Sequence, residues 1–209
     1  MRVAVLGGTG SFGKALAAQL VAAGEHAVLI GSRDAERAQA TAAELGGRAT
    51  GHANDAACSG VDLVVLAVKA EAALETAEAV AEAIGETPLL SVATVMSFAK
   101  DGVRPDPNGR SLAERIQDVV RGPVVAGLHS IAATNLDDGA SDQDVLVCGD
   151  DAEAKALALV LAGDVVGGRA LDAGPLANAR TLEGLTAVIV NLNRRYKAHA
   201  GVRISGLGE

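Results

Sequence analysis

The chain has 209 residues, which is long enough for one complete domain with a small addition. Its net charge of -8 disfavours nucleic acids and anionic membranes as partners, and its aromatic content of 1% argues against a platform for stacking bases. Two cysteines and four histidines form no disulfide framework and no metal-ligand spacing. We therefore expect no metal site, and we expect a cytoplasmic protein without a membrane-spanning segment.

The first predicted strand and the turn behind it form the clearest motif of the chain. Residues 3–6 are an unbroken apolar run, as in a strand that is buried on both faces. Gly8, Gly10 and Gly13 follow at G-x-G-x-x-G spacing, and a helix is predicted over residues 11–23. The first glycine permits a tight turn, the second lets the backbone approach a pyrophosphate, and the third lets helix and strand pack closely. The motif predicts a dinucleotide site at the helix N-terminus.

Two other interpretations of this turn have less support. Residues 8–14 also match most of a P-loop, but Ala15 has no hydroxyl group to hold magnesium, and no later strand ends in an aspartate placed for that metal. The turn could also simply connect a strand to a helix. We favour dinucleotide binding because the three glycines stand directly between a predicted strand and a predicted helix.

The end of the second predicted strand, residues 27–30, indicates which dinucleotide is bound. Sites for NAD usually place an acidic residue there, which binds the ribose 2′-hydroxyl group. This chain has Ser32 and Arg33 instead, and Arg37 lies one helical turn further on. Arg33 can bind a 2′-phosphate with two hydrogen bonds, Ser32 can donate a third, and Arg37 can close the site. The pattern favours NADP, although the two arginines could also be solvated charges at the start of a surface helix.

Most of the remaining chain alternates between apolar strands and helices. Further strands are predicted at residues 48–52, 61–68, 88–95 and 123–128. Helices are predicted at residues 34–45, 54–59, 71–84 and 111–120, and a capping box of Ser111 and Glu114 starts the last of them. The alternation indicates an α/β protein with a Rossmann-type, doubly wound parallel sheet. Residues 96–110 are interpreted as a loop, either over the carboxyl ends of the strands or as an ordinary connection.

The composition changes after residue 134, and we expect two domains. Residues 1–134 would bind the dinucleotide, and residues 135–209 would form a small C-terminal α/β domain. In the second part, strands are predicted at residues 145–148 and 168–171, with a helix at residues 152–162 between them. The longest helix is predicted from residue 174 to about residue 200. It either caps the sheet or takes part in a twofold homodimer, which we expect because dimers are the commonest oligomers.

Two residue sets in this second part carry specific expectations. The acidic connection lacks the spacing of an EF-hand loop, so we interpret it as a solvated link and not as a calcium site. Its acidic residues are Asp137, Asp138, Asp142 and Asp144. The apolar stripe of the longest helix is predicted to consist of Leu182, Leu185, Ile189 and Leu192.

The ordered motifs of the chain resemble the coenzyme F420-dependent NADP reductases over nearly its whole length. These motifs are GGTGSFGKALA, GSR with a later basic residue, LHSI, NLDD, VCGDD and LDAGPLANARTLEGLT. Enzymes of this family pass hydride between NADP(H) and a deazaflavin coenzyme, and the resemblance implies this activity here. One departure is Lys69-Ala70, which stands where the family often has a proline and a tryptophan, and another is the loop near Met96.

The resemblance also implies which residues contact the two coenzymes. The residues expected at the pyrophosphate are Thr9, Gly10, Ser11 and Phe12. Ser32, Arg33 and Arg37 would hold the 2′-phosphate. On the nicotinamide side the matching residues are Ala70, Leu74 and Ala133. His129 and Ile131 would border the deazaflavin.

Anchoring the nucleotide at the glycine turn and Arg33 leaves its nicotinamide over the strand ends near Val68, Ala93 and His129. Direct hydride transfer between nicotinamide C4 and deazaflavin C5 then needs two rings in contact and no nucleophile, with His129 as an orienting partner at most. Two alternatives are an NADP-binding redox sensor without turnover and an NADPH-dependent reductase of another small acceptor. Carbonyl reduction also needs a proton donor, and the chain has no Tyr-x-x-x-Lys motif.

Overall fold

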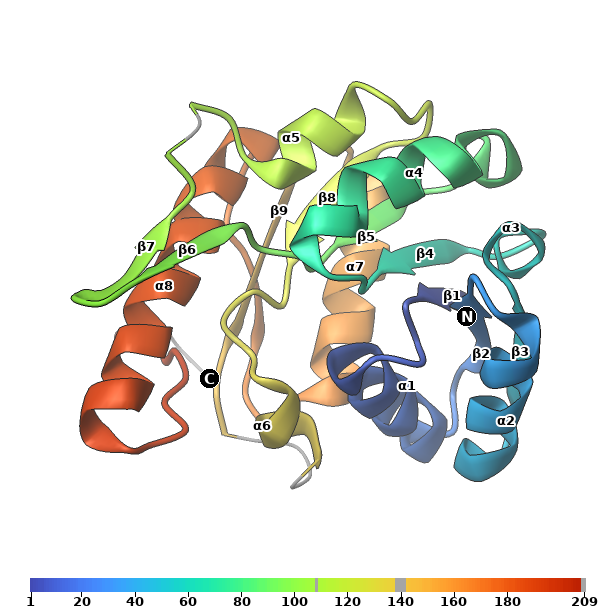
Figure 1. Cartoon of the computed structure of the whole chain (residues 1–209), viewed down its shortest axis with the longest axis horizontal. Coiled ribbons are helices and arrows are strands. Elements are labelled where there is room, and N and C mark those ends of the chain that lie inside the picture. The colour runs from blue at the N-terminus through green and yellow to red at the C-terminus, as the bar shows by residue number, and fades with distance from the viewer. Residues whose placement is uncertain (108, 138–141, 208–209) are drawn as a thin grey trace.

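Eight strands form one central sheet with helices on both faces in the computed structural model of this chain (Figure 1). The structure describes residues 1–107, 109–137 and 142–207. The strands of the sheet are β1 (Arg2–Leu6), β2 (Ala27–Ser32), β3 (Ala49–Ala53), β4 (Leu63–Leu66), β5 (Leu89–Ser91), β8 (Val124–Gly127), β9 (Val145–Gly149) and β10 (Ala170–Asp172). Their order across the sheet is β10-β9-β8-β5-β4-β1-β2-β3. This arrangement confirms the predicted α/β fold.

Each face of the sheet carries its own apolar cluster, because neighbouring residues of a strand point in opposite directions. In β1, for example, Val3 and Val5 belong to one cluster, whereas Ala4 and Leu6 belong to the other. The first cluster is covered by α1 (Ser11–Ala23), α2 (Ala35–Leu45) and α7 (Ala152–Val165). The second is covered by α3 (Asn54–Ala57), α4 (Ala70–Ile84), α5 (Leu112–Gln117), the 3-10 turn η1 (Leu176–Asn178) and α8 (Ala179–Tyr196). None of the helices among the described residues has the length and apolar character needed to cross a membrane.

The direction of the sheet changes between β8 and β9. All pairs from β3 to β8 are parallel, but β8 and β9 are antiparallel, with Gly127 opposite Val147. β10 runs parallel to β9. The parallel sheet that the sequence predicts therefore ends at β8, and the amino ends of β9 and β10 lie at the edge where the other strands have their carboxyl ends. The predicted domain boundary at residue 134 stays a prediction, although β9 and β10 belong to the same sheet as the strands before it.

The interpretation of residues 96–110 as a loop is wrong for residues 96–105. β6 (Met96–Ala99) and β7 (Gly102–Pro105) form an antiparallel hairpin, which lies beside α8 (Figure 1). Asn191 of α8 fixes the hairpin, because its side chain accepts a hydrogen bond from the Val103 N–H at 2.8 Å and donates one to the Val103 carbonyl at 2.7 Å. Ala99 pairs with Gly102, so Lys100 and Asp101 form the two-residue turn, and Gly102, with φ of 145°, begins β7. A glycine at this position was the sequence signal for this element.

The C-terminal half differs from the prediction at three further points. The long helix is shorter than expected, because α8 ends at Tyr196 and Lys197 adopts a left-handed conformation with φ of 51°. Leu192 of the predicted apolar stripe is exposed. Asp144 is not part of a solvated link, since its side chain is 0% exposed and pairs with Arg169. Of the other acidic residues, Asp138 lies outside the described residues.

Candidate functional site

Most of the predicted site residues lie along one edge of the sheet, at the carboxyl ends of its parallel strands. Leu6 of β1 is paired with Gly31 of β2 and with Leu66 of β4, and Leu66 is paired with Ser91 of β5. Ser91 is in turn paired with Ala126 of β8. The residues that follow these positions are Ser32, Arg33, the glycine turn, Val68, Ala93 and His129. The register of the sheet therefore places them in a row, which is the usual position of a ligand in such folds.

The glycine turn has the close contacts that the motif predicts. A Cβ atom on Gly13 would lie 2.4 Å from the Gly7 carbonyl oxygen, so only glycine lets α1 pack this near the strand. A Cβ atom on Gly8 would lie 2.9 Å from the Val5 carbonyl oxygen. By contrast, a Cβ atom on Gly10 would meet only the Gly7 oxygen, at 3.3 Å, which leaves the rest of its surroundings open.

The start of α1 offers uncapped backbone donors. The hydrogen bond from the Lys14 N–H to the Gly10 carbonyl, at 2.8 Å, spans the first turn of this helix. The N–H groups of Ser11, Phe12 and Gly13 come before it, and no side chain forms a cap there. Uncapped donors beside an open glycine are what a pyrophosphate requires, so these residues fit a dinucleotide.

The polar residues at and after the end of β2 lie next to this turn. The Gly7 N–H donates to the Gly31 carbonyl at 3.1 Å, which holds the end of β2 against the start of the turn. The Ser32 hydroxyl accepts a hydrogen bond from the Asp34 N–H at 3.2 Å. The Arg37 guanidinium donates to the Thr9 carbonyl at 3.3 Å, so it connects α2 directly to the turn. Arg33 is exposed, and no ion-pair partner for it occurs among the described residues.

The ends of β4 and β5 form the next part of the row. A methyl group of Val68 would lie 2.9 Å from a Cβ atom on Gly7, so Val68 is packed against the turn. Ala93 is buried, and Ala70 and Leu74 are partly buried residues in the first turns of α4. These side chains are small and apolar, so this part of the edge suits the flat, weakly polar face of a ring.

The segment behind β8 has an unusual conformation that α8 holds in place. Leu128 has φ of 63°, which is rare for a bulky side chain, although the side chain itself is buried in the core. The hydroxyl group of Thr186 in α8 donates to the His129 carbonyl at 2.9 Å. Ile131, three residues after Leu128, is also buried and packs in the first apolar cluster.

The imidazole of His129 is buried without a hydrogen-bond partner. His129 is 6% exposed, and neither ring nitrogen has a hydrogen-bond partner among the described residues. Burial lowers the pKa of His129 to about 4, so the ring is neutral at pH 7. Unpartnered buried nitrogens are costly unless a ligand or water satisfies them. The ring lines a small cavity together with Ser130, Leu146, Leu182 and Leu185.

Ala133 starts α6 (Ala133–Asp137), a short helix that the sequence did not predict. In Figure 1 this helix lies beside α1. Gln19 of α1 donates a hydrogen bond to the Leu136 carbonyl at 2.5 Å. Ala133 is therefore on the same side of the sheet as the helix that starts at the glycine turn.

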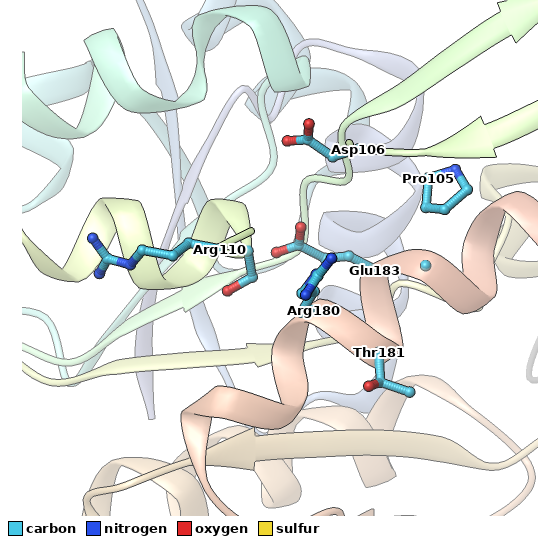
Figure 2. A pocket seen from close by; sticks show the side chains of 8 residues that line it. Pro105, Asp106, Arg110, Arg180, Thr181 and Glu183 are labelled. Atoms are coloured by element: carbon cyan, nitrogen blue, oxygen red, sulfur yellow. The ribbon is translucent and has the colours of Figure 1, made fainter. Parts of the chain in front are cut away.

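A second cavity, of about 230 Å³, lies between the hairpin, the start of α5 and the first turns of α8 (Figure 2). Glu183 is its most unusual residue, because it is 4% exposed and its carboxylate accepts hydrogen bonds from the Leu112 and Ala113 N–H groups at 3.0 and 3.2 Å. Burial raises the pKa of Glu183 above its ordinary value, and these two hydrogen bonds oppose the shift. The other lining residues are Pro105, Asp106, Arg110, Ser111, Arg180, Thr181 and Gly184.

No motif of the sequence predicts a functional or structural role for the side chain of Glu183 or Thr186. The available signal was the position of both polar residues among the apolar residues of a predicted helix, next to Leu182 and Leu185. Such residues need a partner inside the protein, but the pattern does not reveal which partner.

The strand order, the glycine turn and the position of the site at the carboxyl edge define a Rossmann-type dinucleotide-binding protein. Comparison with known proteins narrows this class. Residues 2–94 match the family model described as NADP oxidoreductase coenzyme F420-dependent.

Full-length relatives extend the match to the second half of the chain. The F420-dependent NADP reductase of Methanocaldococcus jannaschii is 32% identical, with 99% of both chains covered. That of Methanothermobacter marburgensis is 36% identical, with 100% of both chains covered. A crystal structure from Arthrobacter sp. FB24, provisionally assigned as an F420-dependent NADP reductase, has a TM-score of 0.84 at 29% identity and covers 99% of this chain and 100% of that chain. The chain belongs to the family of F420-dependent NADP reductases.

Proposed function

We propose that this protein is an oxidoreductase that transfers hydride directly between NADP(H) and the deazaflavin coenzyme F420. The observation that carries the proposal is the row of residues at the carboxyl edge of the sheet, which combines an uncapped glycine turn, a basic strand end and an apolar stretch. Relatives that match the whole chain are F420-dependent NADP reductases, which supports the same pair of coenzymes here.

The nucleotide is anchored at the end of the row that contains β1 and β2. The N–H groups of Ser11, Phe12 and Gly13 bind the pyrophosphate, with Thr9 and Gly10 in the turn beside them. Arg33 and Ser32 bind the 2′-phosphate, and Arg37 supplies a second guanidinium group beside the turn. The nicotinamide then extends along the edge toward Val68, Ala93 and His129, with Ala70, Leu74 and Ala133 around it.

The deazaflavin lies against the nicotinamide, bordered by His129 and Ile131. NADP(H) and the deazaflavin supply the reactive carbons, C4 and C5, between which the hydride passes. The protein contributes proximity and orientation, which are worth up to ~7–11 kcal/mol when reacting atoms are held in contact. His129 is a neutral hydrogen-bond partner that orients a ring, since burial lowers the pKa of its imidazole to about 4 and neither buried ring nitrogen has a partner among the described residues.

An isotope experiment tests the direct transfer. Deuterium on the correct face of NADPH C4 should appear at C5 of reduced F420, and none should be lost to solvent. Hydrogen from solvent at C5 would contradict direct transfer. NADPH binding without turnover of F420 would instead favour a redox sensor, and turnover of a small imine or carbonyl compound alone would favour a different acceptor.

We further infer a twofold homodimer and a cytoplasmic location. Val188, Leu192 and Tyr196 are exposed at four-residue intervals along α8, which forms an apolar stripe suited to a second copy of the same helix. Light scattering at micromolar concentration should give the dimer mass, and Leu192→Glu should shift it to the monomer. The cytoplasm agrees with the two coenzymes and with the free, buried thiols of Cys58 and Cys148.

A further inference from the structure

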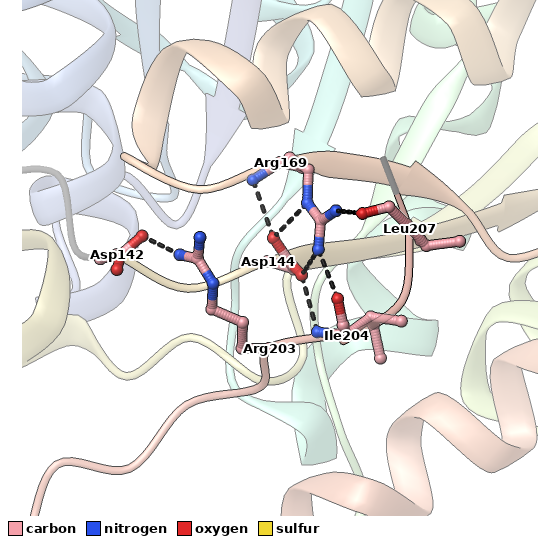
Figure 3. A network of polar contacts seen from close by, with 6 residues as sticks. All are labelled: Asp142, Asp144, Arg169, Arg203, Ile204 and Leu207. Carbon is pink, nitrogen blue, oxygen red and sulfur yellow. Dashed lines mark hydrogen bonds and ion pairs between the residues drawn. The ribbon is translucent and has the colours of Figure 1, made fainter. Parts of the chain in front are cut away.

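The segment that follows α8 in the sequence returns to the edge of the sheet that carries the site. Because β9 and β10 run against the other strands, Asp144 and Arg169, which directly precede them, lie at this edge. Residues 198–207 follow α8, and their backbone contacts the side chains of Asp144 and Arg169 (Figure 3). We call residues 198–207 the C-terminal strap.

An ion pair between the buried Asp144 and the half-buried Arg169 holds the far end of the strap. Two nitrogen atoms of the Arg169 guanidinium donate to the two carboxylate oxygens of Asp144, at 2.7 and 3.1 Å (Figure 3). The same carboxylate accepts from the Ile204 N–H at 2.8 Å, and Arg169 donates to the Ile204 carbonyl at 2.5 Å and to the Leu207 carbonyl at 3.3 Å. The Asp144 N–H also donates to the Val202 carbonyl at 2.7 Å. The pair therefore binds the backbone of the strap, and every polar atom of the Asp144 side chain has a partner.

The near end of the strap is fixed to α8 and to α6. Asn193 of α8 accepts from the Ala200 N–H through its side chain at 2.7 Å and from the Ala198 N–H through its carbonyl at 3.2 Å. Between these two residues, His199 Nδ1 forms a 3.2 Å hydrogen bond with the hydroxyl group of Thr134. Thr134 follows Ala133 in α6, so the strap reaches the helix that borders the proposed nicotinamide position.

We propose that the C-terminal strap is a positioning element for the site: Asp144 and Arg169 fix the strap, and His199 holds α6 through Thr134. The statement that α6 borders the nicotinamide rests on the proposed function. Gln19 holds one end of α6 from α1, and His199 holds the other end from the strap. Loss of the second contact lets α6 shift relative to the glycine turn, and such a shift changes the spacing between the two rings.

This chain offers matched controls for the proposal. The contact between His199 and Thr134 is exposed, so its removal should leave the core intact. Arg203 of the strap pairs with Asp142, but both side chains are largely exposed, and such pairs contribute little. Arg203→Ala therefore changes the strap without removing an anchor.

The experiment combines hydrogen exchange of the unliganded protein with kinetics. His199→Ala and Thr134→Ala should speed amide exchange in residues 133–137 and leave the melting temperature unchanged. Asp144→Asn should speed exchange both there and in residues 198–207. With NADPH and F420, all three variants should lose about two- to tenfold in kcat/KM for F420, the factor expected for one neutral hydrogen bond, while the Kd of NADP stays within about twofold. Thr134→Ser should restore the wild-type values, and Arg203→Ala should match the wild type.

Three results would overturn the proposal. The first is unchanged exchange in residues 133–137 in His199→Ala and Thr134→Ala. The second is a loss of kcat/KM in Arg203→Ala as large as in His199→Ala. The third is a loss in Thr134→Ala that Thr134→Ser does not restore. Absence of F420 turnover in the wild type would contradict the proposed function alone, because the exchange arm does not depend on turnover.

Discussion

The two ends of the site edge are built from different kinds of contact. At the end formed by β1 and β2, the glycine turn is closed by backbone hydrogen bonds between residues three or four positions apart, such as those from Gly10 to Gly7 and from Lys14 to Gly10. At the end formed by β8 and α8, the contacts join residues that are far apart in the sequence. Thr186 reaches His129 over 57 positions, and Glu183 reaches Leu112 over 71 positions.

This difference determines how each end responds to substitution. The turn depends on the absence of side chains, so an added group disrupts it. The other end depends on individual polar side chains that satisfy distant backbone groups, so a removed group disrupts it. Substitutions at four positions test and sharpen this comparison.

The largest effect is expected for Gly13→Val. A Cβ atom there would lie 2.4 Å from the Gly7 oxygen, and a branched side chain would push α1 away from β1. We expect a loss of about 3 kcal/mol or more in the free energy of unfolding, together with loss of NADP binding. Chemical denaturation and titration with NADP measure the two effects. A Gly13→Val protein of wild-type stability would show that the turn tolerates added groups.

Glu183→Ala tests the opposite end. It removes the acceptor of the Leu112 and Ala113 N–H groups, and we expect a loss of about 2–4 kcal/mol. Glu183→Gln keeps one acceptor oxygen and should lose less. If neither variant is destabilised, these contacts do not hold α5 on α8.

The pH dependence of stability in the wild type and in Glu183→Gln gives a second measurement. Because burial raises the pKa of Glu183, the unfolded chain loses this proton at a lower pH than the folded protein. The stabilising contribution of the side chain is therefore fullest below the unfolded pKa of ~4.3 and decreases as pH rises through the raised value. The stability advantage of the wild type over Glu183→Gln should accordingly be larger at low pH than at pH 7.

Arg33→Ala tests the basic strand end. Arg33 is exposed and has no ion-pair partner among the residues that the structure describes, so its loss should not change the fold. We expect NADP binding to weaken by about 1.5–3 kcal/mol, while NAD binding changes little. Calorimetric titration with both dinucleotides measures this difference. Equal affinities of the native protein for NADP and NAD would contradict the assignment of the 2′-phosphate site.

The smallest effect is expected for Gly163→Ala in α7, which also serves as the control for Gly13. No atom lies within 4 Å of a Cβ at Gly163, and the residue is helical, in the last turn of α7. Alanine should stabilise the protein by about 0.5–1 kcal/mol because it reduces the entropy of the unfolded chain. A destabilised Gly163→Ala protein would show that added groups harm this chain in general and not only at the turn.

The sequence predicted the parts of the fold that depend on neighbouring residues. Helix α1 was predicted at its observed bounds, and the capping box of Ser111 and Glu114 is present. The close packing of Gly13 also follows from spacing alone. The assignment of individual residues to the coenzymes stays a prediction, because it depends on positions that only bound ligands reveal.

The features that the sequence did not predict depend on distant partners. The hairpin of β6 and β7 requires Asn191, which lies almost ninety residues further along the chain than Val103. Asp144 looked like part of a solvated acidic link, because its partner Arg169 follows a whole helix later. Hydrophobic periodicity contains no information on such pairs, so the reversed strands β9 and β10 could not be oriented from their sequence.

Leu128 has a consequence for the rate at which a second molecule reaches this protein. Its backbone conformation suits glycine, but its side chain fills the core, and Thr186 holds the neighbouring carbonyl from the other side. The bend behind β8 therefore has one shape, and it cannot open without exposing the interior. A molecule that binds at this bend therefore finds it already in one fixed conformation. We expect its association rate to be limited by diffusion and orientation and not by a slow rearrangement of the bend.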